Sequence, residues 1–428
     1  MSIRRFSMGL NAIVAIFATT LIVTATAAQQ ETVLHSFRQN GKDGVWSYAS
    51  LIFDASGNLY GTTSYGGAYN QGTVFELSPK AGGGWMEKVL HSFGNGKDGV
   101  LPFASLVFDA FGNLYGTTSS GGDGSCVGLT PGCGLVFELK PGAGGSWTEK
   151  ILHNFNNNGT DGYNPNSGLI FDSAGNLFGT TPNGGNGPCT ATNSGCGIVY
   201  ELLLQANGSW AEKVVHNFNS NGSDGYQPNA GLIFDTVGNL YGTTTYGGNP
   251  GPGAVFELKP TASGLWAEKI LHNFSASGTD GYYPYASLIF DAAGNLYGTT
   301  ASGGASTFYG TVFELVATAG GGWTEKILHS FNSVAGGFYP NTTPIFDAAG
   351  NLYGTTNNGG SPGPGTVFEL MPTLGGGWTE KVLYSFDHAR GDGVYPNAGV
   401  IFDAARNLYG TTSYGATTDG GTVFQISH

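Results

Sequence analysis

The chain has 428 residues, of which only 11% are charged, and its formal net charge is −13. Its 16 lysines and arginines form no basic stripe over this length, which argues against nucleic acid as a partner. The 74 glycines come with 40% hydrophobic and 13% aromatic residues, so the chain is no disordered polymer. This composition indicates an all-β protein with many tight turns.

The first 28 residues differ from the rest and have the features of a secretory signal peptide. Two arginines near the start precede an apolar run from about Met8 to Val23, and small residues suit cleavage after Ala27 or Ala28. We therefore expect residues 1–28 to be removed and residues 29–428 to be secreted, to the extracellular space or the periplasm. No later apolar run reaches about 18 residues, so we expect no membrane span.

A ten-residue string, DAAGNLYGTT, occurs unchanged at Asp291–Thr300 and Asp347–Thr356, and near-copies occur five more times. Its NL(Y/F) landmark recurs at steps of 55, 63, 63, 56, 56 and 56 residues, a period of about 56 with two insertions. Each period holds four short strand-like runs separated by Gly, Asn and Asp turns. In the fifth copy these runs are Tyr285–Asp291, Asn295–Thr300, Gly310–Leu315 and Trp323–Phe331.

Four antiparallel strands repeated seven times predict a seven-bladed β-propeller. The mature sequence begins with an unpaired fourth strand, Glu31–Phe37, and finishes on a third strand, Gly421–Ile426. We expect the N-terminal strand to complete the last blade and close the ring, which removes exposed sheet edges. We also expect the protein to be a monomer.

The repeated string itself is expected to be the hairpin between the first two strands of each blade. Asp291 starts the turn, and Gly294 is predicted to be left-handed, a conformation that glycine adopts without strain. A calcium loop is the alternative, but the alternating oxygen ligands and the distal glutamate are missing. The seventh copy has Arg406 in place of the glycine, so Arg406→Gly should stabilise the protein.

Histidine recurs at one position of the fourth strand in six copies. These residues are His35, His91, His153, His216, His272 and His329, and the seventh copy has Tyr384. Each histidine lies on a separate outer strand, so they cannot share one ion, and we expect a buried hydrogen bond between blades instead. The tryptophan of the same strand is expected to pack, and the "EK" pair that follows it to be a solvated ion pair.

Four cysteines form two local pairs, Cys126/Cys133 and Cys189/Cys196, in corresponding loops of neighbouring repeats. In an oxidising compartment, a disulfide within each loop is the expected arrangement. A four-cysteine zinc site is the alternative, but the C-x6-C spacing does not match the usual zinc knuckle.

The turn before the first strand and the loop after the second strand should share one face of the propeller. Loops of this face vary in length and composition, and binding residues favour loops on rigid scaffolds. Its repeated aspartates are Asp43, Asp98, Asp161, Asp224, Asp280 and Asp392, with Gly336 in the sixth copy. We expect no metal or other cofactor; calcium at these aspartates is the alternative to ordinary turn chemistry.

Residues that flank a recurring proline just before the first strand should ring the mouth of the central channel. The candidate ligand-binding residues among them are Trp46, Tyr48, Asn166, Asn229, Tyr283, Tyr285, Asn341 and Asn397. Phe103, Asn164, Gln227, Tyr339 and Tyr395 flank the same position. Amide and aromatic groups suit sugars, through hydrogen bonds and flat apolar contact. A purely packing role for the ring is the alternative.

The repeat "SLIFDAAGNLYGTTASGG…GTVFELVATAGGGWTEKILHSF" resembles the GloVer tandem repeat, found in exported bacterial choice-of-anchor proteins. The resemblance covers essentially the whole mature chain in seven copies. It implies an exported, often surface-associated repeat protein and carries no activity with it. Members of that family can bear a C-terminal sorting anchor; we expect none here from the final residues, which puts surface attachment in question.

The sequence favours a secreted binding or scaffold protein for a glycan or another surface polymer. A propeller hydrolase or lyase is the second hypothesis, but the candidate carboxylates recur in nearly every blade and no unique catalytic set stands out. "DHARGDG" (Asp387–Gly393) is the one dense charged cluster, so we add His388 and Arg390 to the candidate ligand-binding residues. A purely structural envelope protein is the third hypothesis.

Overall fold

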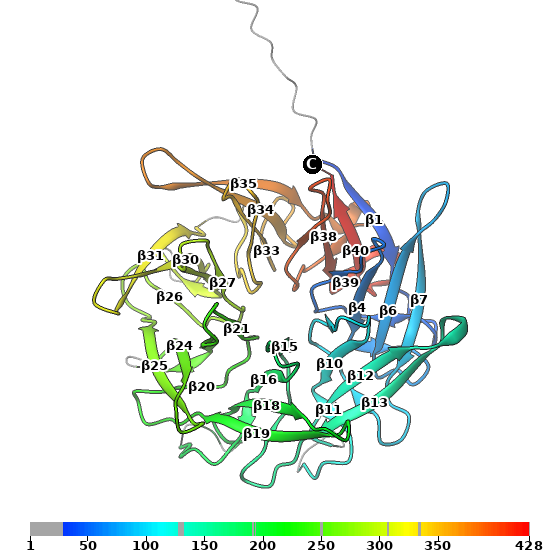
Figure 1. Cartoon of the computed structure of the whole chain (residues 1–428). Coiled ribbons are helices and arrows are strands. Elements are labelled where there is room, and N and C mark those ends of the chain that lie inside the picture. Colours follow the sequence, from blue (N-terminus) through cyan, green and yellow to red (C-terminus); the bar gives the residue numbers. More distant parts are fainter. Residues whose placement is uncertain are drawn as a thin grey trace, which may run out of the picture.

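The computed structural model describes residues 29–126, 132–190, 192, 194–248, 251–305, 308–332 and 335–427. The expected signal peptide, residues 1–28, lies outside the described residues. The chain forms seven four-stranded antiparallel sheets that stand around a central axis (Figure 1). The predicted seven-bladed β-propeller is therefore confirmed.

The innermost strand of each blade is a two-residue Ile–Phe or Val–Phe pair, and the second strand carries the repeated LYGTT or LFGTT. The innermost strands are β3 (Ile52–Phe53), β9 (Val107–Phe108), β15 (Ile170–Phe171), β21 (Ile233–Phe234), β27 (Ile289–Phe290), β32 (Ile345–Phe346) and β37 (Ile401–Phe402). The second strands are β4 (Leu59–Thr63), β10 (Leu114–Thr118), β16 (Leu177–Thr181), β22 (Leu240–Thr244), β28 (Leu296–Thr300), β33 (Leu352–Thr356) and β38 (Leu408–Thr412).

The third and fourth strands lie progressively farther from the axis. The third strands are β6 (Thr73–Pro79), β12 (Leu135–Pro141), β18 (Ile198–Leu204), β24 (Ala254–Pro260), β30 (Thr311–Ala317), β34 (Thr366–Pro372) and β40 (Thr422–Ile426). The fourth strands are β7 (Trp85–Ser92), β13 (Trp147–Asn154), β19 (Trp210–Asn217), β25 (Trp266–Asn273), β31 (Trp323–Ser330), β35 (Trp378–Ser385) and β1 (Glu31–Ser36). Strand β1 pairs with β40, so the N-terminal strand closes the ring as predicted.

A short two-stranded ribbon joins the turn before the first strand to the loop after the second strand in six blades. The ribbons are β2 (Gly44–Val45) with β5 (Tyr65–Gly66), β8 (Gly99–Val100) with β11 (Ser120–Gly121), β14 (Gly162–Tyr163) with β17 (Asn183–Gly184), β20 (Gly225–Tyr226) with β23 (Tyr246–Gly247), β26 (Gly281–Tyr282) with β29 (Ser302–Gly303), and β36 (Gly393–Val394) with β39 (Tyr414–Gly415). The sixth blade has a bridge between Phe338 and Asn358 there. These two segments of each repeat are therefore neighbours.

Helical structure within the described residues is confined to three single 3-10 turns. They are η1 (Ala143–Gly145), η2 (His388–Arg390) and η3 (Ala416–Thr418). No helix of the described part is long and apolar enough to cross a membrane.

The hydrophobic core lies between the blades, because each blade packs its face against the next. The phenylalanine that directly follows each fourth strand meets an aromatic ring of the third strand of the following blade, edge to face, at 5.1–5.2 Å between ring centroids in all seven pairs. The pair Phe37–Phe75 joins the last blade to the first, so the core also closes into a ring.

The repeated GTT sequence joins the blades through hydrogen bonds near the axis. In the fifth blade, the first threonine, Thr299, donates from Oγ1 to the carbonyl oxygen of Thr342 in the next blade at 3.1 Å. The equivalent bond is present at every blade junction, and Thr411 of the last blade donates to Ala49 of the first at 3.1 Å. The glycine is required because a Cβ at Gly298 would stand 2.6 Å from Cζ of Phe313.

The DAAGN hairpin has the structure that the sequence predicts. Asp291 accepts bonds from the backbone N–H groups of Ala293 and Asn295, at 2.9 and 2.8 Å, and from the Asn295 side chain at 2.8 Å. Gly294 is left-handed at φ 86°, and Arg406 holds the same region at φ 68°. The string therefore builds a turn and a blade junction seven times over.

Candidate functional site

Polar groups gather at two kinds of place, the central channel and the outer rim between blades. At the channel, three consecutive residues from each of the seven blades line a cavity of about 160 Å³. The first residues of these triplets are Tyr48, Phe103, Asn166, Asn229, Tyr285, Asn341 and Asn397, which we call the channel ring. Six of the eight candidates predicted at the channel mouth thus face one cavity.

The described lining of the channel carries no Asp, Glu, Lys, Arg or His side chain. The residues that follow each member of the channel ring are Ala, Ser, Gly or Thr. The cavity therefore offers amide, hydroxyl and aromatic groups but no fixed charge. An acid–base pair, which a hydrolase needs, is missing from this lining.

Neighbouring groups fix the orientation of the channel ring. The Asn229 amide nitrogen donates to Thr245 Oγ1 at 2.9 Å, and Asn397 makes the equivalent bond to Ser413 Oγ at 2.8 Å. Burial and the nearby Tyr246 raise the pKa of Tyr285 to about 12, so this phenol stays neutral. Asn341 Oδ1 is buried without a hydrogen-bond donor among the described residues.

Two residues before each ring member, the backbone is left-handed in all seven blades. These residues are Trp46, Leu101, Asn164, Gln227, Tyr283, Tyr339 and Tyr395, with φ between 56° and 60°. Large side chains rarely adopt this region, and strain of this kind tends to persist where the structure depends on it. Each of the seven N–H groups donates to a carbonyl of the preceding blade, for example Tyr283 to Pro252 at 2.9 Å. The bend turns the chain toward the axis and presents the ring residue.

Two candidates from the sequence, Trp46 and Tyr283, are these left-handed residues and do not line the channel cavity. Trp46 packs edge-on against Tyr65 at 4.9 Å between centroids, and Tyr283 lies 5.3 Å from Tyr246. Sequence spacing could not separate this position from that of the ring residue, because the two flank the same site, which is Ser47 in the first blade and proline in the others.

The charged loop near the end of the chain is separate from the channel. His388 and Arg390 lie on η2, with side chains 60% and 71% exposed. His388 Nε2 is 3.1 Å from Asp419 Oδ1, and Arg390 pairs with Asp387 at 3.2 Å. Neither residue lines the channel cavity.

The second gathering of polar groups lies at the rim, where five of the seven junctions bring together a histidine, an aspartate and a glutamate among the described residues. The groups are His35/Asp43/Glu87, His91/Asp98/Glu149, His153/Asp161/Glu212, His216/Asp224/Glu268 and His272/Asp280/Glu325. Within each group, one atom from each residue lies within 4.8 Å of the others. We call these the rim clusters and name each by its histidine.

Three elements build each rim cluster. The histidine comes from the fourth strand of one blade, the aspartate from the connection that follows, and the glutamate from the fourth strand of the next blade. In the fourth strand, a β-bulge falls at the residue before the histidine, as the register shift between Val255 and Phe256 opposite Leu271 shows. A bulge re-aims the side chain that follows it, here His272.

The rim glutamates are crowded against other carboxyl groups. Burial, and then the adjacent Asp161, raise the pKa of Glu212 to about 8, and burial with Asp224 raises the pKa of Glu268 to about 9. The expectation that the "EK" pair is solvated is therefore wrong for the glutamate. Glu and Lys are successive residues of a strand and point to opposite sides, so the lysine is exposed while the glutamate faces the neighbouring blade.

The expected hydrogen bond between blades is present at two rim clusters. His35 Nε2 and His91 Nε2 lie 3.2 and 3.0 Å from their aspartates. At the junctions that lack a full set, Tyr384 donates to Asp392 at 2.6 Å, whereas His329 faces no aspartate and burial lowers its pKa to about 4.

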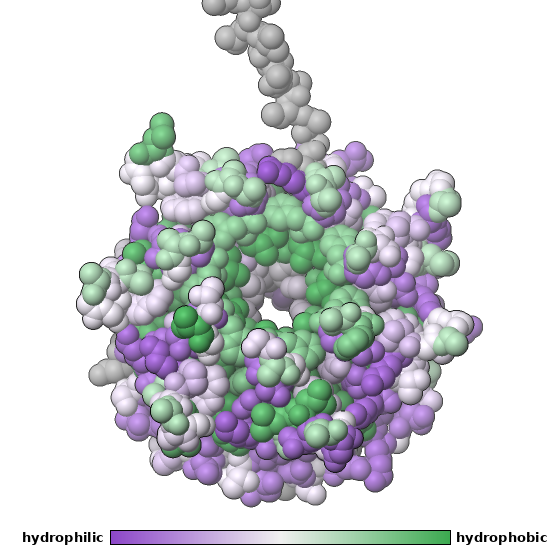
Figure 2. Space-filling view, viewed as in Figure 1, coloured by the Kyte–Doolittle hydropathy of each residue, from purple (hydrophilic) through white to green (hydrophobic). Residues whose placement is uncertain are grey.

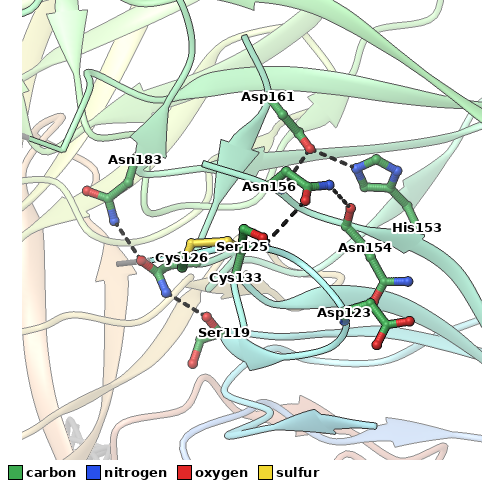
Figure 3. Close-up of a disulfide and its surroundings, with 11 residues drawn as sticks. Ser119, Asp123, Ser125, Cys126, Cys133, His153, Asn154, Asn156, Asp161 and Asn183 are labelled. Atoms are coloured by element: carbon green, nitrogen blue, oxygen red, sulfur yellow. Dashed lines mark hydrogen bonds and ion pairs between the residues drawn. A yellow bond between two sulfur atoms is a disulfide. The ribbon is translucent and has the colours of Figure 1, made fainter. Parts of the chain in front are cut away.

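Both predicted disulfides are present, with Cα atoms 5.3 Å apart for Cys126–Cys133 and 5.5 Å for Cys189–Cys196. Figure 3 shows the first one between two polar networks. On one side, Asn164 takes part in a network with Ser119 and Asn183; on the other, Ser125 contacts Asn156 beside Asp161.

On the face shown in Figure 2, apolar side chains surround the opening of the channel. The channel thus has an apolar border and an uncharged lining, in a chain with net charge −13. This contrast separates the channel from the acidic rim.

Comparison with known proteins gives one family. The sequence model described as the Gloeobacter/Verrucomicrobia repeat matches residues 16–187, 126–345 and 309–428. No curated protein matches the chain.

Proposed function

Because the chain belongs to the Gloeobacter/Verrucomicrobia repeat family, whose repeats here form a closed propeller, we propose that it is an exported binding module whose channel ring takes an uncharged glycan. The two disulfides are compatible with an extracellular or periplasmic site. The absence of a candidate membrane-spanning helix in the described part is also compatible with it.

One observation carries this proposal. Twenty-one residues from seven blades converge on the channel, and the described lining contains aromatic rings and amides without a charged group. Sugars are recognised by this combination, because rings cover their flat apolar faces and amides both donate and accept hydrogen bonds. Anionic ligands would need a cationic partner, which the lining does not contain.

The channel ring is also pre-organised, which lowers the entropy lost on binding. The amides of Asn229 and Asn397 are held by hydrogen bonds, and the left-handed bends fix the backbone before each ring residue. Asn341 Oδ1 supplies a buried acceptor that a ligand hydroxyl would satisfy. A bound sugar would then add a hydrogen bond that the free protein lacks.

The test is equilibrium binding of residues 29–428 to neutral polysaccharides and their oligosaccharides, in a pull-down followed by calorimetry. The double variant Tyr285→Ala with Asn229→Ala removes one ring and one amide, and should weaken binding by about tenfold or more, or about 1.4 kcal/mol. Phe111→Ala is the matched control, because Phe111 is 87% exposed on the β9–β10 hairpin, away from the channel lining. Equal affinity of the double variant and the wild type would reject the channel ring as the site.

A further inference from the structure

We propose that three rim clusters, those of His153, His216 and His272, are binding sites for a divalent first-row transition metal, with Zn²⁺ as the probe ion. This proposal is independent of the channel ring and of any glycan. It rests on the spacing of the ligand atoms, on buried atoms without partners, and on how the ligands are held.

The spacing suits a metal better than it suits hydrogen bonds. His216 Nε2 lies 3.7 Å from Asp224 Oδ2 and 3.5 Å from Glu268 Oε1, and both distances from His272 Nε2 to its carboxylates are 3.6 Å. Four ligands at about 2.0–2.2 Å from a tetrahedral zinc ion are separated from one another by about 3.3–3.6 Å. At the third cluster, His153 Nε2 lies 3.4 Å from Asp161 Oδ2. An ion between the three side chains of the His216 or the His272 cluster needs only small side-chain movements.

In each of these clusters the histidine Nε2 is buried without a hydrogen bond in the described structure. The aspartate Oδ1 and the glutamate Oε1 are buried too, and they face one another with no donor except a proton that the two carboxyl groups would share. Asp161 and Asp224 are only 5% and 3% exposed, so water does not readily solvate them. Each buried unpaired polar group costs about 1–3 kcal/mol, a penalty that a bound cation would remove.

The ligands are already oriented by a second layer of contacts. The aspartate Oδ2 atoms accept backbone N–H bonds, from Asn156 to Asp161 at 2.9 Å and from Asn219 to Asp224 at 3.0 Å. The ring of His216 packs edge-on against Phe218 at 4.7 Å between centroids. Bonds of this kind to the ligating groups are typical of metal sites in proteins.

The donor set defines the class of ion. One imidazole nitrogen and two carboxylate oxygens suit zinc and neighbouring transition metals, whereas calcium takes oxygen ligands alone. The two carboxyl groups also carry more negative charge than the site can hold without a proton or a cation. An ion can reach the clusters because the histidines are 16–19% exposed, and the equivalent His91 cluster lines a cavity of about 550 Å³ at the rim.

The experiment measures zinc bound to the metal-free mature protein, by calorimetry and by elemental analysis after gel filtration. The wild type should retain about three zinc ions per chain and should melt at a higher temperature with zinc than with a chelator, since zinc stabilises the state that binds it. His216→Gln should lose one ion, while His329→Gln, at a junction without the aspartate, should lose none. Near-ultraviolet circular dichroism verifies that each variant is folded.

A second variant adds a site instead of removing one. Gly336 stands where the other junctions have the aspartate, and a Cβ there would lie 2.7 Å from Oε2 of Glu380, beside His329. Gly336→Asp should therefore add one zinc ion. Absence of bound zinc in the folded wild type would overturn the proposal, and so would an unchanged zinc content in both His216→Gln and Gly336→Asp.

Discussion

Arg406 offers a clean measurement of what the repeated glycine contributes to the hairpin. The six equivalent glycines are left-handed, as Gly294 is at φ 86°, and a Cβ at any of them meets nothing within 4 Å. Arg406 adopts the same region at φ 68°, and its side chain is exposed. The difference between the two residues is therefore a backbone effect and not a packing effect.

The magnitude follows from two opposing contributions. A residue with a Cβ costs about 1–2 kcal/mol in the left-handed region. Glycine loses about 0.5–1 kcal/mol more conformational entropy on folding. We expect Arg406→Gly to stabilise the protein by about 0.5–1 kcal/mol, and Gly294→Ala to destabilise it by a similar amount. With an unfolding entropy of about 0.8 kcal/mol/K for a chain of about 400 residues, Tm should change by about 1 °C.

The assay is differential scanning calorimetry of the mature protein, with urea unfolding as a second probe. Arg406→Ala is the control, because it keeps the Cβ and removes the rest of the side chain, and its Tm should stay close to that of the wild type. A fall in Tm for Arg406→Gly, or an equal rise for Arg406→Ala, would refute the backbone explanation.

Three further predictions concern the fold. Thr299→Val removes a buried hydrogen bond across a blade junction and should destabilise the protein by about 1–2 kcal/mol in urea unfolding. Thr324→Val, at an exposed threonine, is the control, and an equal effect of the two variants would contradict the role of this hydrogen bond. Burial opposes ionisation of Asp109, but four hydrogen bonds, of which the one from the backbone N–H of Asn113 contributes most, outweigh burial and lower the pKa of Asp109. The contribution of Asp109 to stability should therefore be complete above pH 3.8, its ordinary pKa, and fall as pH drops through its folded pKa. Asp109→Asn should show a shallower loss of stability with falling pH. Deleting residues 29–37 should lower Tm and expose the edge of β40, and an unchanged Tm would show that the ring does not depend on β1.

The blade count, the ring closure and the hairpin could be predicted from the sequence because each depends on local chemistry repeated at a fixed period. Gly294 shows this, because a left-handed turn favours glycine at one fixed position of each repeat. The disulfides were predictable for the same reason, because each pair closes a short loop.

The rim clusters could not be predicted from histidine spacing alone. His216 has no histidine nearby; its neighbours are Asp224, eight residues later in the chain, and Glu268 from the next blade. The repeated interval of seven or eight residues between histidine and aspartate was a usable signal. The glutamate, the third member of each cluster, belongs to a pair that looks solvated in the sequence, because only the packing of blades shows which side of the strand is covered.

The channel ring was predictable in part. Topology indicates that residues before the first strand reach the axis, but it does not show that the left-handed bend turns Tyr283 aside while Tyr285 lines the cavity. The left-handed position is occupied by Trp, Leu, Asn, Gln or Tyr in the different blades and never by glycine, so its positive φ leaves no common residue type in the sequence.

The most direct test of binding at the channel ring is the thermal unfolding of residues 29–428 with a panel of neutral and anionic oligosaccharides. A ligand that binds only the folded state raises Tm by an amount that grows with its concentration. We predict that at least one neutral oligosaccharide raises Tm of the wild type and leaves the Tyr285→Ala, Asn229→Ala double variant unchanged. Shifts by anionic sugars alone, or equal shifts in both proteins, would contradict a glycan site at the channel ring.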